Sequence, residues 1–206
     1  MRNQSLGTLG STLVPSALAA RLEAHGDSQR AFRSARRAFI DGARIDMGSL
    51  ATSLGVDRTS LFRWVGNRDQ LLSEILWSLA VPTLDAAGRA AAPSGAARIV
   101  DVLDHFTADL IRAPYFRAFL TREPGRALRL LTTTESDVQR RFVAVVTTVI
   151  ATEQAAGTFD PAPLSAEELA RLLVRVSESF TYADLISGDT PDPERARTTF
   201  EYILRP

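Results

Sequence analysis

Residues 50–64 read Leu50-Ala51-Thr52-Ser53-Leu54-Gly55-Val56-Asp57-Arg58-Thr59-Ser60-Leu61-Phe62-Arg63-Trp64, and they carry the most informative structural pattern of the chain. Two short helices joined by a tight turn can cross steeply only if the residue at the crossing is small, which Ala51 provides. Gly55 can adopt the left-handed conformation that reverses the chain. The small core expected beneath the turn comprises Leu50, Leu54, Val56 and Leu61, covered by Phe32, Ala35 and Phe39. The pattern predicts a helix-turn-helix; the alternative is a tight corner in any all-α protein.

The second helix of this unit is predicted to carry a DNA-reading face. Asp57 can cap the helix, and Leu61 and Val65 point inward at helical spacing. Short hydroxyl side chains allow close approach to base edges, and arginine can form two parallel bonds to guanine. A cation beside the start of the following helix provides a phosphate site. The predicted DNA-binding residues are Arg44, Arg58, Thr59, Ser60, Arg63, Trp64 and Arg68.

The composition excludes several kinds of chemistry. The chain has 206 residues and no cysteine, and all 24 of its basic side chains are arginine. Without lysine there is no Schiff-base catalysis and no Walker-type phosphate loop. Without cysteine there is no disulfide, thiol nucleophile or cysteine-bound zinc, which is typical of a cytoplasmic protein. His25 and His105 are far apart, and no apolar run could span a bilayer, so we expect no metal, no cofactor and no membrane partner.

The formal net charge of zero conceals an uneven distribution of charge. Residues 28–70 contain eight arginines against four acidic residues, whereas residues 78–206 contain fourteen arginines against seventeen acidic residues. The basic excess is modest, and it coincides with the predicted helix-turn-helix. Arg36 and Arg37 are interpreted as a solvated face rather than as base readers. The distribution suggests a polyanionic partner for the N-terminal part.

Helical periodicity extends over the whole chain, and no segment shows the alternation of a strand. The sequence therefore predicts an all-α fold, with Pro82 bending one long helix. The predicted helices are 15–25, 28–42, 47–54, 58–64, 68–88, 94–112, 114–122, 124–132, 134–156, 165–187 and 192–204. We expect an N-terminal extension at 1–27, a helix-turn-helix DNA-binding domain at 28–70, and a ligand-binding and dimerisation domain at 71–206.

The stretch 39–72 resembles the DNA-binding domain of TetR-type repressors. Its clearest part is Leu61-Phe62-Arg63-Trp64-Val65-Gly66-Asn67-Arg68-Asp69-Gln70-Leu71-Leu72. In the family, the corresponding run is usually Leu-Tyr-Arg/Tyr-His-Phe, followed by a small turn, a lysine, an acidic residue and Leu-Leu. The resemblance implies an all-helical homodimer, with a three-helix head before a helical ligand-binding and dimerisation bundle. The expected function is a ligand-released repressor that reads a near-palindromic double-stranded DNA operator.

Three stretches of the C-terminal half resemble the QsdR-like subgroup of this family. They lie at 114–120 (Pro-Tyr-Phe-Arg-Ala-Phe-Leu), 126–131 (Arg-Ala-Leu-Arg-Leu-Leu) and 178–188, which begins Glu-Ser-Phe-Thr-Tyr. That subgroup is associated with lactone degradation. The resemblance therefore implies a small lactone or acyl compound as the effector.

Three residues of the head depart from the family pattern. Phe62 replaces a tyrosine whose hydroxyl meets a phosphate, and Trp64 replaces a phosphate-binding histidine. Asp46 replaces a Thr or Ser cap; aspartate caps equally well but repels phosphate. These departures place more of the DNA contact on Arg44, Arg63 and Arg68.

The C-terminal bundle offers two pairs of polar residues within apolar helices. His105 and Asp109 lie one turn apart, as do Glu178 and Tyr182, and these four are the predicted ligand-binding residues. The alternatives are a surface pair for the first two and a core position for Tyr182. The long helices 134–156 and 165–187 each present more than one apolar face, which favours a four-helix dimer interface. A different hypothesis is a small helical enzyme that uses Asp109, Glu178 and His105 as acid–base groups, but no catalytic motif supports it.

Overall fold

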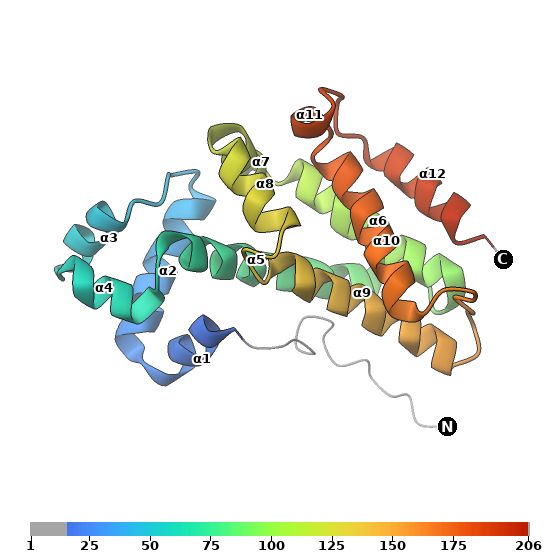
Figure 1. The fold of residues 1–206 in the computed structure, drawn as a ribbon, viewed down its shortest axis with the longest axis horizontal. Helices are drawn as coiled ribbons and strands as arrows, with labels where there is room; N and C mark the ends of the chain where they lie inside the picture. The colour runs from blue at the N-terminus through green and yellow to red at the C-terminus, as the bar shows by residue number, and fades with distance from the viewer. Residues whose placement is uncertain (1–15, 206) are drawn as a thin grey trace. The chain divides into compact units, whose positions relative to one another are not determined.

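The computed structural model describes residues 16–205, which form twelve α-helices and no β-strand (Figure 1). The predicted all-α class is confirmed. In chain order the helices are α1 (Ala17–Ala24), α2 (Gly26–Ile40), α3 (Met47–Leu54), α4 (Arg58–Val65), α5 (Arg68–Ala90), α6 (Gly95–Arg112), α7 (Pro114–Arg122), α8 (Pro124–Thr132), α9 (Val138–Ala155), α10 (Ala166–Thr181), α11 (Ala183–Ile186) and α12 (Pro193–Ile203). Within residues 16–205, no helix is long and apolar enough to cross a membrane.

These helices form two compact units that are not consecutive in sequence. The head unit contains the described residues up to Leu79 together with Pro114–Gln139, and so includes α1–α4, the first half of α5, α7 and α8. The bundle unit contains Ala80–Ala113 and the described residues from Arg140 onward. The domain boundaries predicted at residues 27 and 70 differ from the limits of these units, because α1, α7 and α8 belong to the head unit. Those boundaries stay a prediction.

Local signals explain the helix-turn-helix. Asp46 and Asp57 cap α3 and α4 by accepting hydrogen bonds from the backbone N–H groups of Ser49 and Ser60, each at 2.8 Å. Gly55 ends α3 in the left-handed conformation, with φ 69° and ψ 33°, which other residues adopt only with strain. The two helices therefore lie where the sequence predicts them, within one residue.

The core of the head unit forms beneath the turn and continues into α7 and α8. Leu61 is fully buried, and the predicted neighbours Leu50, Ala35 and Phe39 are also buried. Leu54, Val56 and Phe32 are half-buried, and thus contribute less than expected. The fully buried side chains of this core beyond the helix-turn-helix are Leu71, Leu72, Ile75, Leu120 and Leu130.

The bundle unit is built around α6, which packs against α10 and α12. The core residues there include Leu103, Leu173 and Phe200, all almost completely buried. The hydroxyls of Thr107 and Ser177 form a buried hydrogen bond of 2.8 Å that joins α6 to α10. Apolar packing and this polar contact together fix the two helices against each other.

Three long helices differ in detail from the prediction, and the one predicted over 134–156 spans only Val138–Ala155. The helix predicted over 165–187 ends at Thr181, because Tyr182 leaves helical geometry (φ −112°, ψ 21°), and the short α11 follows. The helix predicted over 68–88 continues past Pro82 to Ala90. The predicted bend at Pro82 stays a prediction.

Candidate nucleic-acid interface

Helix α4 presents one side to solvent and buries the other. Leu61 and Val65 are fully buried, so the positions between them at helical spacing point outward. Ser60 and Trp64 are half-buried at the edges of this surface. The exposed residues, which we call the α4 outer face, are Arg58, Thr59, Phe62 and Arg63. Three of them were predicted as DNA-binding residues.

Ser60 has local partners that limit its availability to DNA. Its hydroxyl donates to Asp57 Oδ2 at 2.8 Å and accepts from Arg63 Nη2 at 3.3 Å. The bond from the Ser60 backbone N–H, with smaller contributions from its hydroxyl, holds the pKa of Asp57 below the usual range. Asp57 is therefore ionised at neutral pH, and Ser60 connects this carboxylate to Arg63.

Asp46, the aspartate that departs from the family pattern, is exposed at the start of α3. Hydrogen bonds from Ser49, of which the backbone N–H contributes most, hold its pKa below the usual range. It therefore keeps a full negative charge at neutral pH. The expectation that it caps α3 is met by the geometry, and its repulsion of a nearby phosphate follows from that charge.

Phe62 is the member of the α4 outer face that is not among the predicted DNA-binding residues. Phe62 is 39% exposed, so part of its ring faces solvent. The available signal was its spacing: Phe62 lies four residues after Arg58 and three after Thr59, on the same side of the helix. The comparison with the family pattern indicates only that a tyrosine hydroxyl is absent at position 62. It does not indicate that the remaining aromatic ring is exposed.

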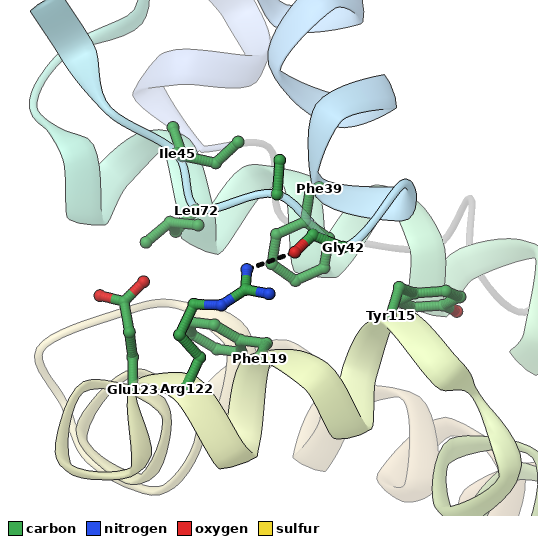
Figure 2. Close-up of a pocket in the computed structure, with 9 residues that line it drawn as sticks. Phe39, Gly42, Ile45, Leu72, Tyr115, Phe119, Arg122 and Glu123 are labelled. Atoms are coloured by element: carbon green, nitrogen blue, oxygen red, sulfur yellow. Dashed lines mark hydrogen bonds between the residues drawn. The ribbon is translucent and has the colours of Figure 1, made fainter. Parts of the chain in front are cut away.

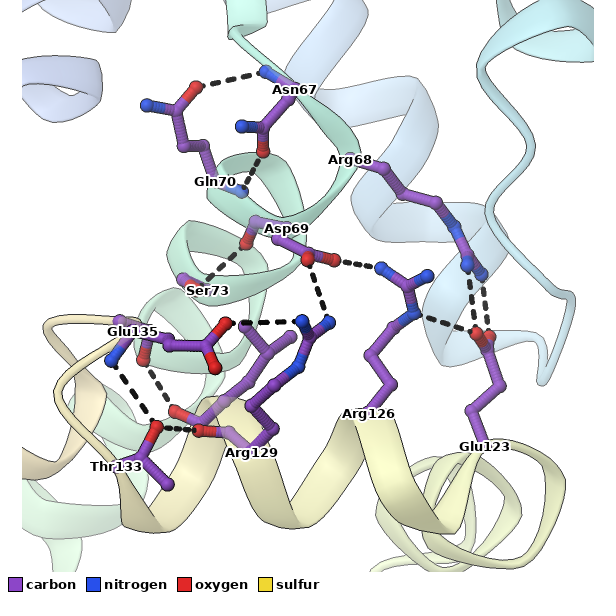
Figure 3. Close-up of polar contacts among 12 residues, drawn as sticks. Asn67, Arg68, Asp69, Gln70, Ser73, Glu123, Arg126, Arg129, Thr133 and Glu135 are labelled. Atoms are coloured by element: carbon purple, nitrogen blue, oxygen red, sulfur yellow. Dashed lines mark hydrogen bonds and ion pairs between the residues drawn. The ribbon is translucent and has the colours of Figure 1, made fainter.

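Arg44 and Arg68, both predicted to meet phosphates, have different surroundings. The side chain of Arg44 is 67% exposed and its Nε lies 3.9 Å from Glu123 Oε1. Arg68 is only 15% exposed. Its Nε donates to the carbonyl oxygen of Ile45 at 2.5 Å. Its two terminal nitrogens donate to the two oxygens of Glu123 at 2.8 and 2.5 Å (Figure 3). Arg44 is available to a polyanion, whereas Arg68 is occupied within the head unit.

A cluster of ion pairs surrounds Arg68 and joins the start of α5 to α7 and α8 (Figure 3). Asp69 binds Arg126 and also Arg129, the latter at 3.0 Å. Arg126 also lies 3.2 Å from Glu123. Burial raises the pKa of Glu123, but the bonds and positive charges of these arginines outweigh it and hold this pKa below its usual value. Within the head unit, the cluster joins α7 and α8 to the start of α5, directly after the helix-turn-helix.

A small pocket lies beside this cluster, between α2 and α7 (Figure 2). The Phe39 and Phe119 rings pack at a centroid distance of 5.4 Å, and Tyr115 lies 6.2 Å from Phe39. Arg122 donates a hydrogen bond to the carbonyl oxygen of Gly42, in the loop that leads to α3. Aromatic packing and this bond attach α7 to the helix-turn-helix at a second point.

The four predicted ligand-binding residues lie on α6 and at the end of α10 in the bundle unit. Asp109 is exposed, and His105 is half-buried with its Nδ1 2.6 Å from the carbonyl oxygen of Asp101. Glu178 and Tyr182 are buried. Glu178 accepts a bond of 2.7 Å from Arg175, and burial, followed by the nearby Glu178 carboxylate, raises the pKa of Tyr182. The two pairs therefore have different environments, and the ligand role of all four stays a prediction.

A groove also opens in the bundle unit, between the α9–α10 loop and the end of α12. Leu164 and Leu172 are both exposed there, although they are large apolar residues. The apolar residues that line the groove include Phe159, Leu164, Leu169, Leu172 and Ile203. None of the four predicted ligand-binding residues lines it.

The sequence of the bundle identifies the family. Residues 94–205 match the family described as "Tetracyclin repressor-like, C-terminal domain". This match covers more than half of the chain, and with a helix-turn-helix at the N-terminal side it shows that the chain belongs to the TetR family. TetR-family proteins are transcriptional regulators and not enzymes, so the alternative of an acid–base enzyme is not supported.

Solved structures agree with this assignment. The chain is similar to the transcriptional repressor QsdR of R. erythropolis, with a TM-score of 0.78 and 28% sequence identity over 86% of this chain and 94% of that one. It also shares its fold with Salmonella enterica GusR, with a TM-score of 0.52 and 17% identity over 93% of this chain and 98% of that one. A search of curated proteins found no match. The predicted resemblance to the QsdR-like subgroup is confirmed by the first of these structures.

Proposed function

We propose that this TetR-family regulator is a ligand-released repressor that binds a near-palindromic operator as a homodimer. The observation that carries the proposal is the α4 outer face, which displays Arg58, Thr59 and Arg63 on a helix whose opposite side is fully buried. Such a face can enter a major groove without any change in the core. The similar protein QsdR is a transcriptional repressor, which supports the direction of regulation.

Each side chain of the proposed interface has a role that follows from its geometry. Arg63 reads guanine through two parallel bonds, and Thr59 approaches a neighbouring base edge. Arg58 and the exposed Arg44 meet phosphates. We assign Arg68 to the junction with α7 rather than to a phosphate, because a phosphate contact would cost its bonds to Glu123 and Ile45. Trp64 and Ser60 support the face from its edges.

The homodimer places two such faces on one operator. A two-fold dimer reads half-sites about 34–36 Å apart, or a multiple of that distance. We propose α9 and α10 of each subunit as the interface. Leu172 of α10 supports this, because it is exposed together with Leu164 along one apolar groove, and adjoining exposed apolar side chains mark surfaces that a partner covers.

Release by an effector requires a connection from the bundle to the head, and the chain supplies it. Ala113 alone separates α6 from α7, and residues 133–137 join α8 to α9. A ligand that shifts α6 or α9 therefore pulls on α7 and α8, which the ion-pair cluster holds to the head. Such a ligand favours the conformation in which the spacing of the two DNA-binding heads does not match the operator half-sites. The proposed effector is a small lactone or acyl compound bound in the bundle near His105, Asp109, Glu178 and Tyr182.

The function is tested with DNA selected from a random duplex library by the wild-type protein. The affinity for the selected duplex should fall steeply between low and physiological salt, because phosphate contacts release counterions. Arg63→Ala should weaken this affinity by about 1–3 kcal/mol and relax base preference at one position in each half-site. Arg195→Ala, at an exposed position of α12 and outside the proposed interface of α9 and α10, removes the same charge away from the head and should have little effect.

Two results would contradict the proposal. An affinity that stays flat with salt excludes phosphate-driven binding, and failure to enrich any sequence excludes a specific operator.

An acylated homoserine lactone added to the complex tests the effector class. We expect it to release the DNA, and a Glu178→Gln variant should need more of it.

A further inference from the structure

Helix α1 precedes the three-helix head and packs against α2 and α4 (Figure 1). Its eight residues are too few to form a stable helix alone in water, so its order depends on packing. Leu18 provides that packing: its side chain is 4% exposed, like the core residues of the helix-turn-helix. Helix α1 is therefore an integral part of the head unit.

The start of α1 is attached to α5. The Ser16 hydroxyl caps α1 by accepting the backbone N–H of Ala19 at 2.8 Å and donates to Glu74 Oε2 at 2.6 Å. Glu74 is buried on α5, two turns after that helix begins. A buried carboxylate needs such donors, because removing it from water without hydrogen bonds is costly. Ser16 thereby couples the position of α1 to that of α5.

The middle of α1 is attached to α4. Arg21 Nη1 lies 3.4 Å from the carbonyl oxygen of Arg63, in the last turn of α4. Carbonyl groups in a last helical turn lack partners within the helix, and a cation there is favourable. The contact uses the backbone of Arg63 and leaves its guanidinium on the outer face. Helix α1 thus holds α4 without covering the surface that reads DNA.

We propose that α1 is a positioning element that sets the orientation of the DNA-reading helix. Its two polar contacts lie on either side of the α4–α5 turn at Gly66 and Asn67, with Leu18 packed in the core between them. Loss of α1 packing would let α4 rotate in the groove. Binding driven by phosphates would survive this change, but base discrimination would not. The inference rests on the proposed DNA-binding function.

The test compares specific with non-specific affinity in the full-length protein. Leu18→Ala should lower affinity for the duplex selected by the wild type by about tenfold or more, and for a scrambled duplex by less than about threefold. Leu18→Met, which conserves volume, should restore the wild-type ratio. Ala20→Ser changes an exposed position of the same helix and should behave as the wild type.

Arg21→Gln provides a variant that does not disturb the core, and it should lower the same ratio about threefold. Its matched control is Arg30→Gln, since Arg30 is exposed on α2 and is paired with Asp27 of the same helix. Equal losses on both duplexes, or an unchanged ratio in Leu18→Ala and Arg21→Gln, would overturn the proposal.

Amide hydrogen exchange separates this inference from the proposed function, because it needs no DNA. In Leu18→Ala, the amides of α4 should exchange faster than in the wild type, while those of α10 should be unchanged. Unchanged exchange in α4 overturns the positioning role even if operator binding is established. Faster exchange in a protein that selects no DNA would support the role of α1 and reject the function.

Discussion

Replacement of Glu123 by glutamine should destabilise the head unit by about 2 kcal/mol. Breaking a fully buried ion pair costs about 3–5 kcal/mol, whereas an exposed pair contributes about 1 kcal/mol or less. The side chains of Arg68 and Glu123 are 15% and 13% exposed, which places this pair between the two limits. Glutamine keeps one acceptor oxygen but removes the charge shared by Arg68, Arg126 and Arg44. For a chain of this size the change should lower Tm by about 4–8 °C.

The effect should depend on pH in a defined direction. The folded protein holds the pKa of Glu123 below its ordinary value of 4.5, so the ionised form stabilises the fold. This contribution is complete above pH 4.5 and is lost as pH falls through the lower pKa of the folded state. The difference in unfolding free energy between wild type and Glu123→Gln should therefore be constant near neutral pH and shrink below about pH 4.

The assay is denaturant unfolding at several pH values, followed by circular dichroism. Glu135→Gln is the control, because Glu135 also pairs with an arginine of the cluster but is 53% exposed. That variant should lose about 0.5 kcal/mol or less. Equal stabilities of the two variants at neutral pH, or a difference that grows in acid, would refute the reasoning about partial burial.

Four further changes test the fold and the interface. Phe62→Tyr restores the hydroxyl that family members direct at a phosphate, and should raise affinity for the selected duplex about tenfold in a titration at fixed salt. Thr107→Val removes the buried bond to Ser177 and should lower the unfolding free energy by about 1–2 kcal/mol, part of which Ser177→Ala should recover in the double variant. Gly55→Ala should cost about 1–2 kcal/mol in denaturant titrations, because φ is 69° although the space for a methyl group is open. Gly125→Ala, in helix α8 with open space and no positive φ, should instead be stabilising.

The helix-turn-helix could be predicted from sequence because its signals are local. Asp46 and Asp57 cap the helices whose starts they mark, Gly55 supplies the turn, and Leu61 and Val65 point inward at helical spacing. Each signal acts within four residues, so periodicity and capping rules detect it. The outward direction of Arg58 and Arg63 follows from the same spacing.

The return of α7 and α8 to the head could not be predicted in this way. Arg68 and Glu123 are 55 residues apart, and nothing near either residue indicates that they pair. The sequence pattern predicts a phosphate contact for Arg68, whereas in the structure its guanidinium binds Ile45 and Glu123. The same limit applies to Ser16 and Glu74, which are 58 residues apart. Partnerships between distant charged residues need the tertiary structure.

The composition of the head unit has a consequence for synthesis on the ribosome. This unit joins the residues up to Leu79 with Pro114–Gln139, and the chain between them belongs to the other unit. After Leu79 has been translated, about 60 more residues must follow before the head unit is complete at Gln139, which takes about 3–12 s at typical rates of elongation. During that interval, the buried face of the nascent helix-turn-helix lacks the aromatic and charged partners that α7 and α8 supply. Slow translation across α6 would prolong its exposure to chaperones and proteases.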